Sequence, residues 1–305
     1  MNPTVSVVIP TIGRPELSRA VLSAHRQTGV ETQIVVVVDR PEMITKVKSA
    51  VGDLAQVVGN AGQGGAAARN EGARLGSGHY IAFLDDDDWW EPNKLTVQIA
   101  AMRKADANFC FGSAWFHSGS DMRRLPITPF VSEEQTLASY MVRRPNVRFG
   151  YSLVQSSSFV VSSRIARECL WDATLRKHQD WDFALRLQER EDVRLIFVEQ
   201  PLVHVAQAST GSVSKQNNLE SSLRFVQRHS RGMDDEAYAD FIVSIYLRAA
   251  LATRDLKEIS RGVSMLHARS ALPRWPVLIV ALSGLVSGLW LPLRNFASRL
   301  LHRRV

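Results

Sequence analysis

The sequence predicts an α/β protein whose sheet is Rossmann-like and mostly parallel, with helices on both faces. Two observations support this prediction. Through residues 1–110, short apolar runs alternate with helical patterns. The runs are apolar at consecutive positions, which is typical of strands buried on both faces. Strands and helices that alternate in this way form a parallel sheet covered on both sides.

The first half of the chain shows these elements in order. Residues 5–9 form an apolar run that ends at Pro10, and apolar residues then follow from Leu17 with the i, i+3, i+4, i+7 spacing of an amphipathic helix. Residues 34–38 are β-branched and favour a strand. The expected strands are 5–9, 34–38, 56–58 and 80–84, and the expected helices are 17–24, 45–51, 66–75 and 93–104.

The second half is less regular. The expected strands are 109–116, 157–161 and 195–205, the last interrupted by Pro201, and the expected helices are 182–190, 218–229 and 237–253. We expect a catalytic domain over residues 1–230, with a nucleotide-binding half (1–110) and an acceptor half (111–230). A helical region over 231–305 follows it.

Composition excludes several classes of protein. Hydrophobic residues make up 45% and charged residues 22% of the chain, which excludes a disordered or collagen-like protein. Two cysteines without a CxxC pattern form neither a disulfide framework nor a zinc site. This usage indicates a reducing compartment. The N-terminus lacks the pattern of a secretory signal, so we expect a cytoplasmic protein.

Four consecutive aspartates are the strongest chemical signal. Asp85, Asp86, Asp87 and Asp88 follow a buried strand and precede two tryptophans. Neighbouring carboxylates repel one another, so a cation is expected beside them, and their hard oxygens suit Mg²⁺ or Mn²⁺ with a substrate phosphate. In extended backbone Asp85 and Asp87 point the same way and Asp86 the other. The alternative is a solvated acidic turn.

Other polar residues follow the neighbouring strands. Ligands of parallel α/β sheets bind at the carboxyl ends of the strands, where Pro10, Thr11, Asp39 and Asn60 lie. The carboxylate of Asp39 can accept hydrogen bonds from a nucleobase or ribose, although a turn or cap residue is an equal alternative.

A glycine-rich loop, residues 59–65, leads into the third helix. Its backbone N–H groups can hold a phosphate, although the loop matches neither the P-loop nor the dinucleotide fingerprint. Arg69 on that helix can pair with phosphate or with the acidic run, and a structural ion pair is the alternative.

Three segments together resemble the family-2 glycosyltransferases with the GT-A fold. They are VSVVIPTIGRPELSRAVLSAHRQT, IVVVVD and AAARNEGARLGSGHYIAFLDDDDWWEPNKL, in the family's order and spacing within residues 4–95. The resemblance implies a nucleoside-diphosphate-sugar donor and a Mg²⁺ or Mn²⁺ cofactor. Many members carry a second acid after the nucleobase aspartate, where this chain has Arg40, and the donor nucleotide therefore stays open.

The resemblance also implies roles for single residues. Asp39 would contact the base, Asp85 the ribose or sugar, and Asp87 the metal on the diphosphate. The residues expected on the donor side are Pro10, Thr11, Arg14, Asp39, Asn60, Arg69, Asp85 and Asp86.

A candidate catalytic base lies in the second half. Transfer to a hydroxyl requires a carboxylate that removes its proton. Asp180 and Asp182 precede a helical pattern, and the resemblance aligns Asp180 with the family's general base and Arg186 with its helix arginine. The alternative places Asp180 at a helix N-cap with Asp182 in the first turn.

The remaining site residues are weaker candidates. His204 is a candidate third metal ligand, with a half-buried histidine as the alternative. The family's QxxRW motif of processive synthases is absent from the sequence, which favours single additions. The residues expected to contact a saccharide or lipid-linked saccharide acceptor are Gln155, Ser157, Gln179 and Trp181.

The C-terminal region carries the whole charge excess. Residues 261–305 hold seven arginines and no acid, and without these seven the chain has 30 Lys and Arg and 30 Asp and Glu. Residues 275–293 are uncharged but contain Pro276 and Pro292, which leaves a stretch shorter than the ~20 residues of a membrane span. An apolar stretch beside a basic tail indicates contact of 275–305 with the inner face of a membrane rather than nucleic acid. A true span and a buried helix pair are the alternatives.

The leading interpretation is an inverting, metal-dependent glycosyltransferase of surface polysaccharide or glycolipid biosynthesis. A haloacid-dehalogenase-like phosphotransferase or phosphatase also places Asp-x-Asp after a strand, and a non-catalytic sugar-nucleotide-binding module is a third reading. The upstream strand that ends at Asp39 and the helix with Arg69 favour nucleotide-sugar binding.

Overall fold

A computed structural model describes residues 2–148, 150–206 and 218–285 of the 305. The chain divides into two compact units. The first unit comprises Met1–Leu137 and Ser152–Lys215, and the second comprises Ala138–Tyr151 and Gln216–Val305. This division differs from a single boundary at residue 230, because the chain enters the second unit twice.

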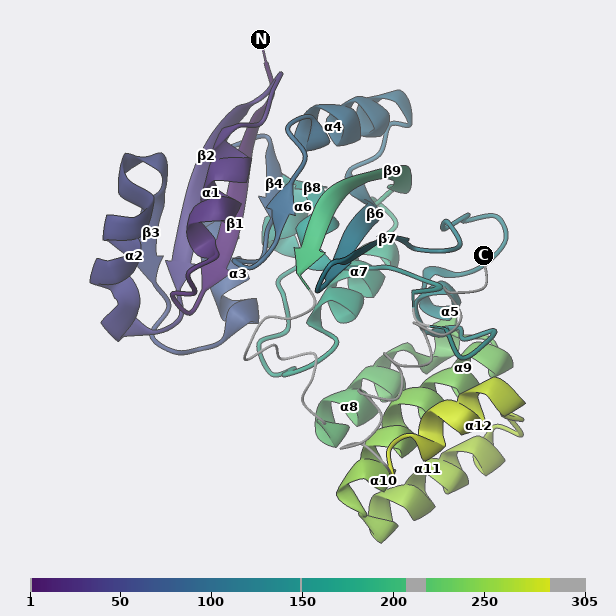
Figure 1. The fold of residues 1–305 in the computed structure, drawn as a ribbon. Helices are drawn as coiled ribbons and strands as arrows, with labels where there is room; N and C mark the ends of the chain where they lie inside the picture. The colour runs from purple at the N-terminus through teal and green to yellow at the C-terminus, as the bar shows by residue number, and fades with distance from the viewer. Residues whose placement is uncertain (1, 149, 207–217, 286–305) are drawn as a thin grey trace. The chain divides into compact units, whose positions relative to one another are not determined.

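The first four strands form the predicted parallel half of the sheet (Figure 1). Their order is β3, β2, β1, β4, and each pairs with its neighbours in parallel. They are β1 (Thr4–Thr11), β2 (Glu31–Val38), β3 (Gln56–Gly59) and β4 (Tyr80–Phe83). The helices between them are α1 (Leu17–His25), α2 (Ile44–Val51), α3 (Gly65–Leu75) and then α4 (Lys94–Lys104).

The side chains of β2 alternate between two apolar layers. Val36 and Val38 belong to a core cluster that includes α1, whereas Val35 and Val37 pack with Ala68 of α3. Helices therefore cover both faces, as the continuous apolar runs predicted.

Helix α3 lies very close to β1. A Cβ atom on Gly72 would come within 2.2 Å of Val8 Cγ1, so this position has room only for glycine.

The second half of the sheet is mixed. β8 (Val160–Ser162) is antiparallel to both β4 and β6 (Phe109–Ser118), while β9 (Leu195–Ala206) is parallel to β6. Two short strands complete it, β5 (Trp89–Trp90) on β9 and β7 (Asp121–Leu125) on β6, both antiparallel. The expectation of a mostly parallel sheet is therefore wrong for this half. A hairpin through Gly119 and returning strands replace the strand–helix alternation there.

Three elements differ from their predicted limits. β9 is one strand across Pro201, because its pairing with β6 shifts register between Gly112 and Ala114 and leaves the proline within the irregularity. Residues 156–158 form a 3₁₀ turn before β8 rather than part of a strand. Helix α7 begins at Gln179 and ends at Gln188, so Asp180 lies inside its first turn. The helix α6 (Ser163–Glu168) separates β8 from this segment.

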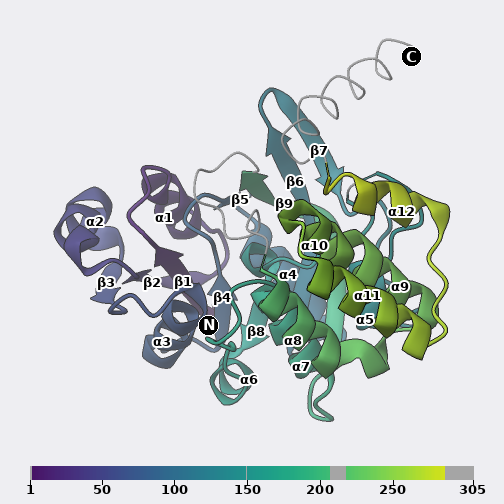
Figure 2. The ribbon, with the colours of Figure 1, turned by 90° about the horizontal axis from the view of Figure 1, so that it is seen from below.

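The second unit is helical. Asn218, Asp234 and Asp255 cap its helices by accepting hydrogen bonds from backbone N–H groups three residues ahead. Figure 2 shows α10 beside α11 and α12. Its elements are α5 (Leu137–Val142), α8 (Leu219–His229), α9 (Asp235–Phe241), a π-helical turn (Ile242–Leu247), α10 (Arg248–Thr253), α11 (Leu256–Ala268) and α12 (Trp275–Leu282).

The apolar stretch at 275–293 is only partly described. Its first part forms α12, and residues 286–293 lie outside the described residues. Across the ranges that the structure describes, we find no helix whose length and apolar character would let it cross a membrane.

Candidate active site

The four aspartates alternate in exposure along the loop after β4. Asp86 and Asp88 are buried, whereas the side chains of Asp85 and Asp87 keep 28% and 14% of their exposure. Two carboxylates of the run therefore remain accessible to a ligand. Residues 86 and 87 form a turn closed by a hydrogen bond from Asp88 N to Asp85 O at 3.1 Å, so the extended backbone on which the predicted side-chain directions depended is absent here.

Asp86 joins the acidic run to the end of β1. Thr11 Oγ1 donates to Asp86 Oδ2 at 2.6 Å, and Arg14 Nη1 donates to the other oxygen. Burial raises the pKa of Asp86, which Thr11 and Arg14 oppose by stabilising the carboxylate. Thr11 and Arg14 thus hold the loop through Asp86, and Pro10 precedes Thr11 in β1.

Asp88 joins the run to the second half of the sheet. Its carboxylate accepts from Ser157 Oγ at 2.6 Å, from Gln155 Nε2 at 2.7 Å and from Ala206 N at 3.1 Å. Burial, followed by the charges of Asp85 and Asp87, raises its pKa well above the ordinary value. Gln155 and Ser157, predicted as acceptor contacts, therefore serve as partners of Asp88.

Asp39 and Asn60 meet at the ends of β2 and β3. Asp39 Oδ1 accepts from Asn60 Nδ2 at 2.8 Å and from Gly64 N at 2.7 Å. Gly64 has a positive φ of 90°, a conformation that favours glycine. The glycine-rich loop is thereby closed on Asp39, and these two predicted donor residues lie together.

Arg69 reaches from α3 to both halves of the site. Its Nη2 donates to Asp85 Oδ1 at 2.5 Å, and its Nη1 donates to Gln179 Oε1 at 3.3 Å. The guanidinium also lies over the ring of Trp171, 4.7 Å from its centroid. The predicted Arg69–acid pair is therefore present, and Gln179 belongs to it.

Asp180 lies beside Asp85 through a shared serine. Ser156 N donates to Asp180 Oδ2 at 3.1 Å, and Ser156 Oγ donates to Asp85 Oδ2 at 3.2 Å. Burial raises the pKa of Asp180 to about 6, and the charge of Asp85 acts in the same direction, whereas Arg69 and Ser156 lower it. Two carboxylates from distant parts of the chain thus converge at one point. Ser156 lies between the predicted acceptor residues Gln155 and Ser157 in a run of three serines, but the sequence gives no signal of its bonds to the two acids.

The first turn of α7 carries the flanking residues. His178 precedes the helix with a positive φ of 63°, and its ring stacks on that of Trp181 at 5.2 Å. Asp182 is buried and accepts from Arg186 Nε at 2.8 Å. This ion pair lies within α7. Arg186 Nη1 also donates to Cys169 Sγ at 3.2 Å, which ties the helix that carries Asp180 to the end of α6.

His204 has contacts that do not suit a metal ligand. Its Nε2 is 2.8 Å from Glu91 Oε1 and its Nδ1 is 2.9 Å from His117 Nε2, so both ring nitrogens already have partners. The ring stacks on Trp89 at 4.8 Å. Within the described ranges, no group of three or more His, Cys, Asp and Glu side chains is arranged to hold a metal. The structure therefore gives no support to the prediction for His204.

The chemistry of the acidic run still suits a hard cation. Asp87 offers a partly exposed carboxylate whose Oδ2 forms an ion pair with Arg14 Nη1 at 3.7 Å. Mg²⁺ and Mn²⁺ take few protein oxygens and complete their coordination with phosphate and water. The residues present thus fit a cation that arrives with a diphosphate.

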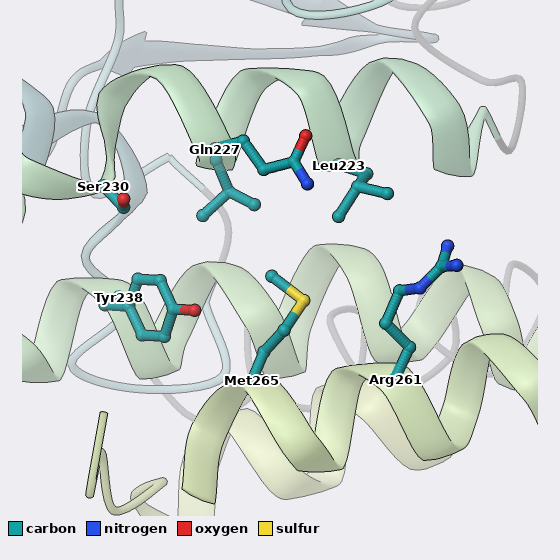
Figure 3. A pocket seen from close by; sticks show the side chains of 7 residues that line it. Leu223, Gln227, Ser230, Tyr238, Arg261 and Met265 are labelled. Atoms are coloured by element: carbon teal, nitrogen blue, oxygen red, sulfur yellow. The ribbon is translucent and has the colours of Figure 1, made fainter. Parts of the chain in front are cut away.

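A separate hollow of about 480 Å³ lies in the second unit (Figure 3). Leu223 and Gln227 of α8 face Met265 and Arg261 of α11 across it. The predicted site residues all belong to the first unit, so this hollow is no part of the candidate active site.

The comparison with known families decides the assignment. The family model described as "Glycosyl transferase family 2" matches residues 6–171, more than half of the chain. The chain belongs to glycosyl transferase family 2. It is a glycosyltransferase, and the haloacid-dehalogenase and non-catalytic interpretations are wrong.

Two relatives match this family 2 glycosyltransferase over most of its length. It is 26% identical to the amylovoran biosynthesis glycosyltransferase AmsB of Erwinia amylovora, over 72% of this chain and 75% of AmsB. It is 24% identical to a protein of Escherichia coli named as a colanic acid biosynthesis glycosyl transferase, WcaA, over 86% and 98% of the two chains. A shorter match, 31% identical over 36% of this chain and 45% of the relative, is to the E. coli UDP-Glc:alpha-D-GlcNAc-diphosphoundecaprenol beta-1,3-glucosyltransferase WfgD.

A solved structure shares the fold of this family 2 chain. The S. aureus protein TarS, crystallised in complex with UDP-GlcNAc, superposes with a TM-score of 0.62 at 14% sequence identity. The match covers 86% of this chain and 79% of the TarS fragment. The GT-A-like α/β architecture is therefore confirmed.

Proposed function

We propose that this enzyme transfers a sugar, with inversion and with the help of Mg²⁺ or Mn²⁺, from a nucleoside-diphosphate sugar to a hydroxyl group. The proposed acceptor is a saccharide or lipid-linked saccharide of polysaccharide biosynthesis. The names of AmsB and WcaA support this setting, and the name of WfgD supports a lipid-linked acceptor. The donor nucleotide stays open, because Arg40 replaces the acid that many members carry beside the base.

The single observation that carries the proposal is the junction of Asp85, Ser156 and Asp180. A direct displacement needs a donor held on one side and a base for the incoming hydroxyl on the other. Asp85 belongs to the acidic run after β4, and Asp180 belongs to the first turn of α7. Hydrogen bonds from one serine to both acids bring the two sides together.

Each part of the junction has a role in the proposed displacement. Asp39 and Asn60 receive the nucleoside, and Arg69 orients Asp85 toward the ribose or sugar. Asp180 accepts the proton of the acceptor hydroxyl as the new bond forms on the face opposite the leaving group. Its pKa of about 6 keeps it ionised near neutral pH but more basic than an ordinary aspartate. A Mg²⁺ or Mn²⁺ ion at Asp87, when bound, would supply charge neutralisation for the departing nucleoside diphosphate.

The test is release of nucleoside diphosphate from a panel of nucleotide sugars with Mn²⁺ and acceptor extract. The wild type should release one nucleotide with acceptor present, and Asp180→Asn should lose roughly 10²–10⁴-fold in transfer while it binds the nucleotide as before. Asp121→Asn, an exposed acid on β7, is the control and should keep full activity. Wild-type turnover by Asp180→Asn would remove the base assignment.

We also propose that α12 lies on the inner face of an anionic membrane. One stripe of this helix and the following turn exposes five large apolar side chains, each 42% to 68% exposed, while Val277, Val280 and Ala281 on the other side are buried. The exposed residues are Trp275, Leu278, Ile279, Leu282 and Leu285. After Glu258 the sequence contains no acid, and four arginines follow residue 285. An apolar stripe with a tryptophan beside a purely basic segment complements anionic lipid better than a protein surface.

Vesicle flotation tests this membrane contact. The protein should float with vesicles that contain phosphatidylglycerol and much less with phosphatidylcholine alone, and Leu278→Ser with Leu282→Ser should abolish flotation without unfolding. Leu170→Ser, an equally exposed leucine of the first unit, should float like the wild type. If the protein floats with neither kind of vesicle, the membrane proposal is wrong. It is also wrong if the wild type is a dimer and the double variant a monomer, because the apolar stripe would then be covered by a second copy of the chain.

A further inference from the structure

Ser156 stands between the two acids of the proposed reaction. Its backbone N–H donates to Asp180, and its hydroxyl lies 3.2 Å from Asp85 Oδ2. Arg69 Nη2 donates to the same hydroxyl oxygen at 3.3 Å. The side chain is fully buried, so water does not compete for these bonds.

The hydroxyl has two acceptors for one proton. A serine hydroxyl donates a single hydrogen bond at a time. In the structure the hydroxyl donates to Asp85 Oδ2 at 3.2 Å. Asp180 Oδ2 lies 3.1 Å from the backbone N of the same serine, so a rotation about the Cα–Cβ bond turns the hydroxyl toward the second acid. Whichever acid receives the proton is stabilised as a carboxylate, and the other loses that bond.

We propose that Ser156 is a positioning residue that couples occupation of the donor site to the readiness of Asp180. Without a donor, the hydroxyl serves Asp85. When hydroxyl groups of the donor ribose or sugar donate to Asp85, the serine hydroxyl is released and turns to Asp180. This inference rests on the proposed function, in which Asp85 contacts the donor and Asp180 is the base.

The charges around Asp180 act in the same direction. The charged groups that face it are Arg69 from α3 and Asp85 from the loop after β4. Asp85 disfavours ionisation of Asp180, and hydrogen bonds from a donor to Asp85 weaken that repulsion. Donor binding therefore favours ionised Asp180 twice, through reduced repulsion and through the turned hydroxyl. A larger fraction of Asp180 is therefore ionised, and able to accept a proton, once the donor is in place.

The matched variants separate this role from packing. Ser156→Ala removes the hydroxyl and keeps the backbone N–H, while Ser156→Thr keeps both. Ser158→Ala is the control, because Ser158 Oγ donates to the Gln155 carbonyl and is as deeply buried. The measurement is the pH dependence of transfer at saturating donor, together with KM for donor and acceptor.

At saturating donor, Ser156→Ala should move the acid limb of the rate upward by about half a pH unit. At pH values below the apparent pKa of Asp180, the rate of the variant should be about threefold lower than that of the wild type. At alkaline pH the two rates should be nearly equal, because the substitution changes only the ionised fraction of Asp180. KM for the donor should change by no more than about threefold, because the coupling between the donor site and Asp180 is reciprocal. Ser156→Thr should restore the wild-type limb, and Ser158→Ala should leave it in place.

Three results would overturn the inference. They are an unmoved acid limb in Ser156→Ala, an equal loss of rate at every pH, or the same shift in Ser158→Ala. If Ser156→Ala does not fold, Ser156→Cys replaces it, since a thiol keeps the size but donates weakly. Absence of transfer by the wild type, or full activity of Asp180→Asn, would instead contradict the proposed function itself.

Discussion

At the scale of single residues, the site contains buried acids whose ionised form lowers the stability of the folded protein. Asp180 is ionised near neutral pH in a position whose burial and whose neighbour Asp85 both favour the neutral form. Arg69 and Ser156 lower the pKa of Asp180, but they offset only part of the increase caused by burial and by Asp85. A base with a raised pKa therefore carries a stability penalty in the free protein.

This penalty predicts that Asp180→Asn is more stable than the wild type above about pH 6. The folded-state pKa of about 6 exceeds the ordinary 3.8, so the contribution of this group is present at low pH and is lost as the pH rises through 6. Asparagine keeps the neutral form at every pH. We expect a gain of about 1–2 kcal/mol at neutral pH and none near pH 4, measured by urea unfolding.

The control for this prediction is Asp121→Asn, whose exposed carboxylate should give no pH-dependent gain. Equal stability of Asp180→Asn and wild type at neutral pH would show that Arg69 and Ser156 fully compensate the charge.

At the scale of elements, α4 carries an unusual buried cation. Lys94 at its start is fully buried, and its Nζ lies 3.9 Å over the ring of Trp90 without a hydrogen-bond partner among the described residues. Burial lowers the pKa of Lys94 to about 7. On the same helix, Gln98 Nε2 donates to the Ser158 carbonyl, and the neighbouring Trp90 donates to that of Ser157. Side chains of α4 and β5 therefore hydrogen-bond to the 3₁₀ turn at residues 156–158.

Replacement of Lys94 by methionine should stabilise the protein at pH 7. The unfolded chain binds the lysine proton up to about pH 10, whereas the folded chain releases it above about 7, so the wild type gains stability as the pH rises between these values. Methionine removes this dependence. We expect a gain of roughly 1–3 kcal/mol at pH 7 that disappears near pH 10, measured by thermal or urea unfolding.

Lys104→Met, at the exposed end of the same helix, should change stability little at either pH. A loss of stability in Lys94→Met would mean that the contact with Trp90 outweighs the cost of burial.

The elements also show why the sequence predicts one half of the fold better than the other. The strands from β1 to β4 and their helices follow the apolar runs, because both faces of a parallel strand are buried and the pattern is local. β5, with two residues, and β7, with one buried residue, leave no such pattern and depend on pairing with β9 and β6. Their existence is decided by partners far along the chain.

The candidate site divides in the same way. Asp39, Asp85 and Asp180 each stand where a strand ends or a helix begins, and their positions could be predicted. Tertiary contacts decide which carboxylates stay accessible to a ligand and which are buried in hydrogen bonds within the protein. Asp88 and Ser156 are examples, because Asp88 accepts from Ser157 and Ser156 donates to Asp85, in each case a residue far along the chain.

At the scale of the whole chain, the second unit is built from two separate segments. The excursion at Ala138–Tyr151 joins the helices that follow residue 216. Arg144 N donates to Asp240 Oδ2 at 2.6 Å, and Ser139 Oγ accepts from Asp234 N at 3.0 Å. Tyr140 and Met141 are buried.

A chain shortened to residues 1–215 should therefore aggregate or express poorly. It keeps the complete candidate active site but removes the partners of α5, which exposes apolar side chains such as Tyr140 and Met141. Size-exclusion chromatography of this fragment beside the full chain is the measurement. A monodisperse, active fragment would show that α5 needs no cover.

The contact of Gly72 with Val8 has a consequence far from any reacting atom. Arg69 lies one turn earlier on the same helix, and a methyl group at position 72 would press that helix outward from β1. The guanidinium would then move away from Asp85, and the enzyme would bind its nucleotide donor with lower affinity. A random mutagenesis screen for impaired donor affinity should thus recover substitutions at this small, chemically inert position as readily as at the acids themselves.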